Sequence, residues 1–228
     1  MKLTRTKLKN ADGRSLGNTT LFILTLVTLF LVPVFPLALH KNLYDILFSA
    51  ILLMAALAME KNRKIIFIFA LVAFITERFS EALDLSYLNA LSRSINMIFF
   101  VIIVISLILQ VARTRKVTAQ VILASINGYL LTGILFALMI ALLMWLDPES
   151  YSFSRHADFS GRHIYYFSDY LYFGFVTLTT VGYGDVVPLK PLSKSLSNLT
   201  SVTGQIYIAV IIAMLVGKYA SVQNREYK

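Results

Sequence analysis

The stretch TLTTVGYGDVVP, residues 177–188, places threonines, two glycines around a tyrosine, and an aspartate in an otherwise apolar part of the chain. Gly182 and Gly184 can adopt left-handed backbone conformations at little cost, whereas residues with side chains are strained there. If the handedness alternates along residues 180–184 (the TVGYG segment), successive carbonyl oxygens point the same way. Stacked rings of such carbonyls replace the hydration shell of a monovalent cation. The spacing therefore favours cation binding by the backbone, with the side chains of Val181 and Tyr183 turned away towards supporting aromatic residues.

Composition places this stretch in a membrane protein. Of 228 residues, 57% are hydrophobic and 14% are charged, and the mean hydropathy is +0.72. A soluble domain usually has roughly 25% charged residues. The formal net charge of +9 falls at the edges of apolar runs, so it indicates membrane orientation and not nucleic-acid binding.

Six apolar segments approach the roughly 20 residues that a helix needs to cross a bilayer core. They cover about residues 21–39, 43–59, 64–79, 95–111, 117–146 and 196–219. Pro33 and Pro36 should kink or end the first of these helices. We therefore predict an all-α membrane protein with six transmembrane helices.

Between the fifth and sixth segments lies the aromatic sequence YYFSDYLYFGFVTL, residues 165–178, which is too short to span. It predicts a helix that enters the membrane and stops, with Ser168 as its N-cap. Irregular backbone at membrane depth is tolerated only where protein buries it or where it lines a water-filled path. We therefore expect a re-entrant pore helix followed by the TVGYG segment. The carboxyl end of that helix carries partial negative charge, which favours a cation.

The charges are consistent with both termini being cytoplasmic. Residues 1–20, 60–64, 112–116 and 218–228 then hold 14 Lys or Arg against three acids, as the positive-inside rule requires. The predicted organisation has four parts. They are a cytoplasmic N-terminal tail (1–20), a four-span peripheral membrane domain (21–116), a pore domain (117–219) and a short cytoplasmic tail (220–228).

One such loop cannot surround an ion, so the function requires an oligomer. Carbonyl filters of this kind are built from four loops, which predicts a homotetramer with fourfold symmetry. Asp185 then places one carboxylate per subunit at the outer mouth, where it raises the local cation concentration.

The sequence TLTTVGYGD, with an aromatic pore helix before it and an apolar helix after it, resembles the potassium channel family over about residues 117–219. The resemblance implies that dehydrated K⁺ binds at Thr180, Val181, Gly182, Tyr183 and Gly184. It also implies that Asp185 supports the filter from behind, with Tyr172 and Phe173 at the positions of an aromatic cuff. Of these two, only the tyrosine can donate a hydrogen bond. Val176 stands where some relatives have a carboxylate that partners the aspartate, so that network is not expected here.

Gly204 matches the point at which the inner helix of such channels bends, and Gly217 lies nearer its cytoplasmic end. The alternative is that both are packing glycines, which are common in membrane helices. The sequence leaves both roles open.

The fourth segment lacks the regularly spaced arginines that a voltage sensor needs. Arg113, Arg115 and Lys116 follow its end and are expected to be cytoplasmic anchors. We therefore expect no steep voltage gating.

The resulting prediction is a potassium-selective channel that conducts passively in a plasma membrane, with a prokaryotic inner membrane as the expected setting. The alternatives are a weakly selective monovalent cation channel and a non-conducting membrane scaffold or sensor. The chain has no cysteine, and its three histidines show no convincing metal-site pattern. No arrangement of nucleophile and base appears, so we predict no enzyme activity and no cofactor other than permeating K⁺.

Overall fold

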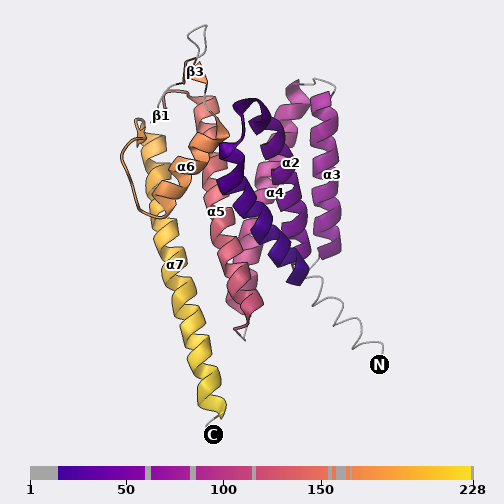
Figure 1. Ribbon diagram of the computed structural model, residues 1–228, viewed down its shortest axis with the longest axis vertical. Coiled ribbons are helices and arrows are strands. Elements are labelled where there is room, and N and C mark those ends of the chain that lie inside the picture. The colour runs from indigo at the N-terminus through magenta and orange to yellow at the C-terminus, as the bar shows by residue number, and fades with distance from the viewer. Residues whose placement is uncertain are drawn as a thin grey trace. The chain divides into compact units, whose positions relative to one another are not determined.

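The computed structural model describes residues 15–59, 63–82, 86–114, 117–153, 156–157, 163–164 and 166–226. These residues are mostly helical (Figure 1), which confirms the predicted all-α class. The chain divides into two compact units, Met1–Gly128 and Tyr129–Lys228. The division falls within helix α5 (Ala119–Leu146), and each unit is described by itself.

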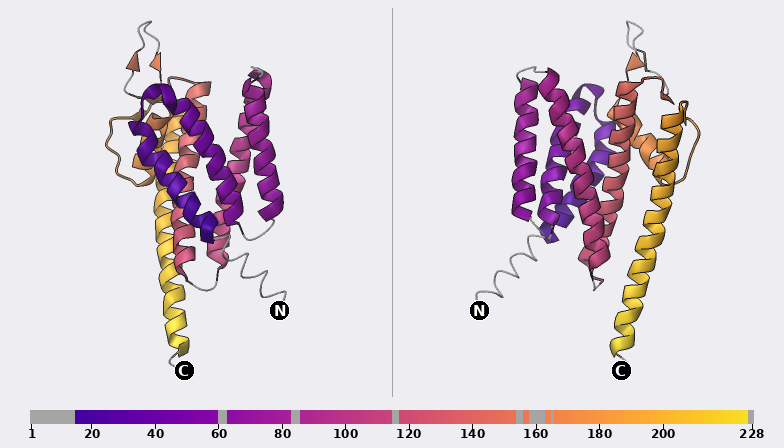
Figure 2. Two further views of the ribbon diagram at one scale, coloured as in Figure 1. Left: turned by 45° about the vertical axis from the view of Figure 1, so that its right-hand side comes forward. Right: turned by 180° about the vertical axis from the view of Figure 1, so that it is seen from behind.

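The first unit begins with a helix at Ser15 that passes into a π-helical turn and then a 3₁₀ turn. Its elements are η1 (Val27–Leu31), η2 (Val32–Val34), α2 (Leu37–Ala58), α3 (Arg63–Ala82), α4 (Ser86–Arg113) and the start of α5. Pro33 lies in η2 and Pro36 is the N-cap of α2, so the predicted end of the first helix at these prolines is confirmed. Figure 2 shows α3 beside both α2 and α4.

Small and polar residues join the first helix to its neighbours in this unit. A side chain at Gly17 would lie 3.2 Å from the backbone nitrogen of Ala58, so the glycine permits a close helix contact. Gln120 donates to the hydroxyl of Ser15 at 2.7 Å, and Asn127 donates to the carbonyl of Asn18 at 2.9 Å. Interhelical hydrogen bonds of this kind strengthen packing where lipid gives no hydrophobic driving force between helices.

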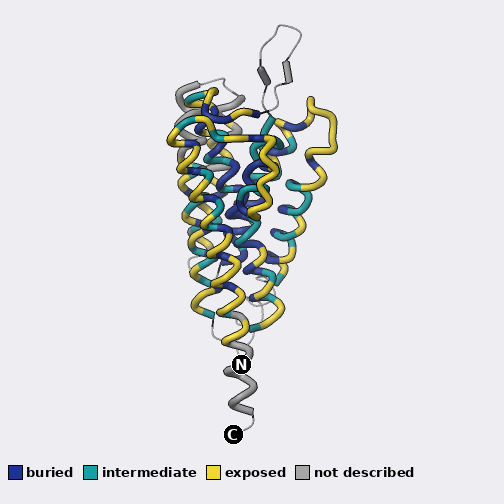
Figure 3. Tube along the Cα trace, turned by 90° about the vertical axis from the view of Figure 1, so that its left-hand side faces the viewer, coloured by how far each residue is buried: buried dark blue, intermediate teal, exposed yellow. Residues whose placement is uncertain are grey.

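Within the described residues, five helices are long and apolar enough to cross a membrane. They are Ser15–Val34, Leu37–Ala58, Ile95–Arg113, Ala119–Leu146 and Pro191–Met214. The third predicted span forms helix α3, which has 20 residues but contains five charged residues near its ends. The structure therefore supports a multi-pass membrane protein, with five of the six predicted spans meeting this criterion. Exposed positions recur along the helices (Figure 3), and many of them carry apolar side chains.

The second unit contains the remainder of α5, four two-residue strands, the short helix α6 and a long terminal helix. Its elements after α5 are β1 (Tyr151–Ser152), β2 (His156–Ala157), β3 (His163–Ile164), α6 (Phe167–Leu178), β4 (Val187–Pro188) and α7 (Pro191–Glu226). Strand β1 pairs antiparallel with β4, and β2 pairs antiparallel with β3. Helix α6 packs against α7, and the chain after α6 returns to the end of the unit from which α6 started (Figure 1). This path is the predicted re-entrant loop.

The ends of the helices differ from the predicted ones in two places. Helix α7 begins at Pro191 and continues to Glu226, so it is longer than the predicted span at both ends. The prediction that Ser168 is the N-cap of α6 is wrong, because the helix begins at Phe167, two residues earlier than predicted, and Tyr166 is its N-cap. Asp169 instead accepts a hydrogen bond from the Tyr166 backbone N–H at 3.1 Å. A carboxylate in the first turn satisfies a free N–H and suits the helix dipole.

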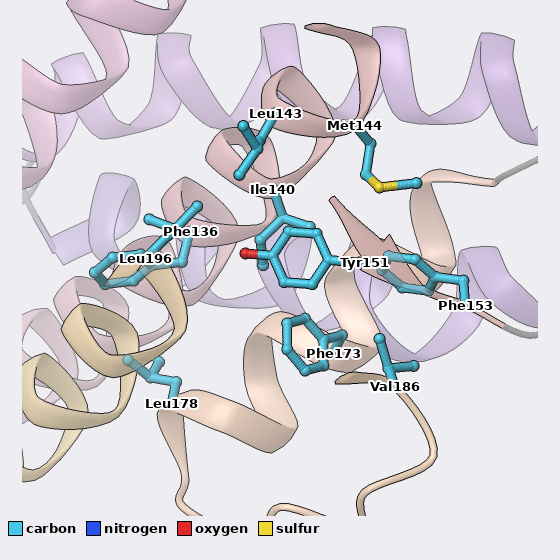
Figure 4. Packing of buried hydrophobic residues seen from close by; sticks show 10 residues of the cluster. All are labelled: Phe136, Ile140, Leu143, Met144, Tyr151, Phe153, Phe173, Leu178, Val186 and Leu196. Atoms are coloured by element: carbon cyan, nitrogen blue, oxygen red, sulfur yellow. The ribbon is translucent and has the colours of Figure 1, made fainter. Parts of the chain in front are cut away.

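An aromatic core supports α6 from the side of the loop that follows α5. Tyr151, Phe153 and Phe173 are buried and meet in tilted and edge-on contacts with ring centroids 5.2 to 6.0 Å apart. Figure 4 shows Tyr151 among the aliphatic and aromatic side chains of this core. Aromatic pairs in these geometries contribute beyond their buried area, so the core fixes α6 in place.

Gly204 allows α7 to approach the carboxyl end of α6. A side chain at this position would collide with the backbone carbonyl of Leu178. Gly204 therefore acts as a packing glycine between α6 and α7, which is one of its two predicted roles. The bending role stays a prediction.

We expect Gly204→Ala to destabilise the protein, because the added methyl has a backbone oxygen in its way and overpacking costs about 1–3 kcal/mol. Gly217→Ala is the matched control, since no atom lies within 4 Å of a side chain added there. Alanine is also the better helix former by about 1 kcal/mol. Thermal unfolding in detergent micelles should show a lower midpoint for Gly204→Ala only. Equal midpoints for the two variants would contradict the contact.

Candidate functional site

The backbone of the TVGYG segment alternates in handedness. The φ angles of Thr180, Gly182 and Gly184 are 59°, 58° and 79°, and no other described residue has a positive φ. The left-handed conformation predicted for the two glycines is confirmed. Thr180 was not predicted, because a β-branched residue at positive φ is an outlier. The alternation begins one residue before the first glycine.

The last turn of α6 holds the start of the segment. The backbone N–H of Thr180 donates to the Thr177 carbonyl at 3.0 Å. The N–H groups of Val181 and Gly182 both donate to the Val176 carbonyl, at 3.0 and 3.3 Å. Carbonyls at the end of a helix have no partner within the helix. These bonds therefore satisfy both the α6 carbonyls and the N–H groups of the segment.

Two side chains of α7 reach the same place. Gln205 donates through Nε2 to the Thr180 hydroxyl at 2.9 Å, and Ser201 donates to the Thr177 carbonyl at 3.3 Å. Residues four apart on a helix share a face, so both bonds come from one side of α7. Sequence reasoning missed both residues. The sequence gives no distinctive signal for them, because residues 197–203 of the same span hold several other polar side chains.

At the outer end of the segment, Tyr172 supports Asp185. The Tyr172 hydroxyl donates to Oδ2 of Asp185 at 2.7 Å, which is the bond expected of the aromatic cuff. The ring of Tyr172 also stacks on that of Tyr183, with centroids 6.5 Å apart and planes 7° apart. Phe173 has a different place, since it is 6% exposed and packs on Tyr151 and Phe153 in the core.

The segment is open on its other side. All residues from 179 to 185 are exposed in the single chain. Val181 is 53% exposed and Tyr183 is 70% exposed, so the stacking on Tyr172 covers only part of the tyrosine. The predicted burial of these two side chains by the chain's own aromatic residues is therefore incomplete.

A second group of contacts ties the loop after α5 to the segment between Asp185 and α7. Lys190 lies 2.7 Å from Oδ2 of Asp147, and 3.4 Å from Glu149. The Ser193 hydroxyl donates to the Ser150 carbonyl at 2.6 Å, close to the paired strands β1 and β4. We call these contacts the loop clamp. The hydrogen bond from Lys190 lowers the pKa of Asp147, and the same bond raises the pKa of Lys190.

Comparisons with known proteins match part of the chain. Residues 130–220 match the family described as "Ion channel". The chain is 38% identical over 93 residues to two-pore potassium channel 4 of Arabidopsis thaliana, a match that covers 40% of this chain and 32% of that protein. It is 29% identical over 93 residues to potassium voltage-gated channel subfamily A member 5 of Homo sapiens, covering 41% of this chain and 15% of that protein.

A third relative is potassium voltage-gated channel protein shk-1 of Caenorhabditis elegans, which is 34% identical over 55 residues. That match covers 24% of this chain and 10% of the relative. The chain thus spans about a third or less of the length of these curated relatives. No solved structure matches the chain significantly.

The stabilisation that the loop clamp gives should depend on pH. Because the pKa of Asp147 is lower in the folded protein, the stabilisation that it gives is present above its ordinary pKa of 3.8 and is lost as the pH falls through the folded value. We expect Asp147→Asn to lower the thermal unfolding midpoint at pH 7, and this difference from the wild type to shrink towards pH 3. Glu149→Gln is the matched control and should have a smaller effect, because Glu149 is farther from Lys190 and 81% exposed. An equal difference at both pH values would argue against the ion pair as the cause.

Proposed function

We propose that the chain conducts K⁺ passively across a membrane through its TVGYG segment, because residues 130–220 match the ion-channel family and the chain is similar to a potassium channel. The observation that carries the proposal is the alternation of positive φ at Thr180, Gly182 and Gly184. In a regular strand successive carbonyls point to opposite sides, whereas alternating handedness directs them to one side. Carbonyls arranged in this way replace the water around a K⁺ ion.

The ion-binding groups in this proposal are the backbone carbonyls of the TVGYG segment together with the Thr180 hydroxyl. Thr180, Val181, Gly182 and Tyr183 bind K⁺, and Gly184 completes the segment at the outer mouth. Asp185 draws cations to that mouth and is held by Tyr172. Phe173 supports α6 indirectly, through the aromatic core.

The proposed active form is a homotetramer. Residues 179–185 are irregular and exposed in the single chain, and backbone of this kind has no place in lipid. Further copies around an axis would cover it, and four loops are what a carbonyl filter requires. The exposed apolar side chains Val202, Ile206 and Val210 follow one face of α7 and offer a surface for a neighbouring copy.

Steep voltage gating is not part of the proposal. The membrane-crossing part of α4, Ile95–Arg113, has no basic residue before Arg113 at its last turn. Moving several charges through the field is what gives voltage sensors their steepness. The charge distribution also supports cytoplasmic termini in a plasma membrane. The proposal includes neither an enzyme activity nor a cofactor other than permeating K⁺.

The direct test is flux from liposomes that contain the purified full chain, with K⁺ compared with Na⁺. We expect K⁺ flux to exceed Na⁺ flux strongly. Equal fluxes would identify a weakly selective cation channel, and no flux of either ion would identify a scaffold. Both results would overturn the proposal.

Gly182→Ala should abolish conduction or K⁺ preference. A side chain in the left-handed conformation costs about 1–2 kcal/mol per residue, and each subunit of the tetramer would carry the strain. The measurement is the same flux assay, with Gly217→Ala as the matched control because that position is open and lies near the end of α7. An unchanged K⁺ preference in Gly182→Ala would show that the TVGYG segment is not the selective site.

A further inference from the structure

Thr180 occupies the innermost position of the TVGYG segment, and its side chain is held by α7. We propose that Gln205 is a positioning residue that orients the Thr180 hydroxyl and thereby sets the affinity of the innermost ion site. This inference rests on the proposed function, since it assigns the strength of one site within the same filter.

The hydroxyl of Thr180 has one hydrogen and two lone pairs. Its hydrogen is donated to the Thr179 carbonyl at 2.7 Å. One lone pair accepts the Nε2–H of Gln205 at 2.9 Å. A single lone pair then remains for a cation, and the two hydrogen bonds fix its direction.

The backbone at Thr180 requires such support. A β-branched residue at a φ of 59° is strained, and strained residues persist where surrounding contacts over-determine them. Gln205 supplies one contact to Thr180, and Ser201 fixes the Thr177 carbonyl, to which the Thr180 N–H is also bonded. Gly204, on the same face of α7, brings the helix close enough for both.

The Gln205 side chain is uncharged, and this affects the electrostatics beside Thr180. Its side chain is exposed in the single chain, and its amide is neutral. In the proposed tetramer four such amides would surround the inner end of the filter. A carboxylate in the same position would put four negative charges beside the innermost site, where a divalent cation would respond more strongly than a monovalent one.

Block of K⁺ flux by Ba²⁺ measures the innermost site. Ba²⁺ is close to K⁺ in size and carries twice the charge, so it binds where K⁺ binds and leaves slowly. We expect Gln205→Met, which keeps the length and removes the donor, to weaken Ba²⁺ block from the side of the α7 carboxyl end. The net value of a hydrogen bond predicts a loss of about twofold to tenfold. Gln205→Glu should instead strengthen the block at neutral pH.

A double-mutant cycle separates this role from general support of the fold. Thr180→Val removes the hydroxyl and keeps the shape, so Gln205→Met should have no further effect on Ba²⁺ block in that background. Ile208→Met is the matched control, because this residue of α7 is 40% exposed and lies off the face formed by Val202, Ile206 and Val210. It should leave the block unchanged.

The outcomes distinguish the two proposals. Suppose that the wild type conducts K⁺, and that Ba²⁺ blocks Gln205→Met and Gln205→Glu as strongly as it blocks the wild type. The positioning role is then wrong, and the channel function stands. An equal effect of Gln205→Met with and without the Thr180 hydroxyl would also overturn it. Absence of K⁺ flux in the wild type would instead contradict the proposed function itself.

Discussion

The main constraint on the structure is that the backbone of the TVGYG segment forms neither a strand nor a helix and must be fixed by other elements of a membrane protein. The TVGYG segment makes few bonds with itself, so other elements must define it. The end of α6 does so through the Val176 and Thr177 carbonyls, which accept from Thr180, Val181 and Gly182. Helix α7 adds side chains only because Gly204 permits its close approach. The conformation of the segment thus depends on the contact between two helices.

The two ends of the segment are held by different chemistry. At the inner end the contacts are backbone bonds and neutral side chains from α6 and α7. At the outer end Tyr172 holds the Asp185 carboxylate, and beyond it the loop clamp joins Asp147 to Lys190. Acid and salt act on charged contacts at the surface far more than on hydrogen bonds between neutral groups. Changes of pH or salt should therefore weaken the contacts of Asp185 and the loop clamp before those between α6, α7 and Thr180.

Much of this arrangement could be predicted from the sequence, because the signals are local. Glycine identity indicates positive φ, prolines end the first helix, and apolar runs give the helices. The errors have physical causes. Residue preference favours Ser168 as the N-cap, whereas α6 begins at Phe167 and Asp169 makes the capping bond. The positive φ of Thr180 and the role of Gln205 could not be predicted in this way, since they depend on a contact between residues 25 positions apart.

Val176 shows why a substitution at a supporting position need not weaken the site. The resemblance to potassium channels sets a carboxylate against the apolar side chain that this chain has at Val176, yet the Val176 backbone carbonyl accepts two N–H groups of the segment. Those bonds need no ionisable group and are available to any residue in the last turn of α6. The aspartate at the outer mouth then keeps a partner in Tyr172, which donates a hydrogen bond without adding charge. Support of the segment in this chain thus comes from helix geometry and a neutral hydrogen-bond donor, and the packing of α6 against α7 positions both.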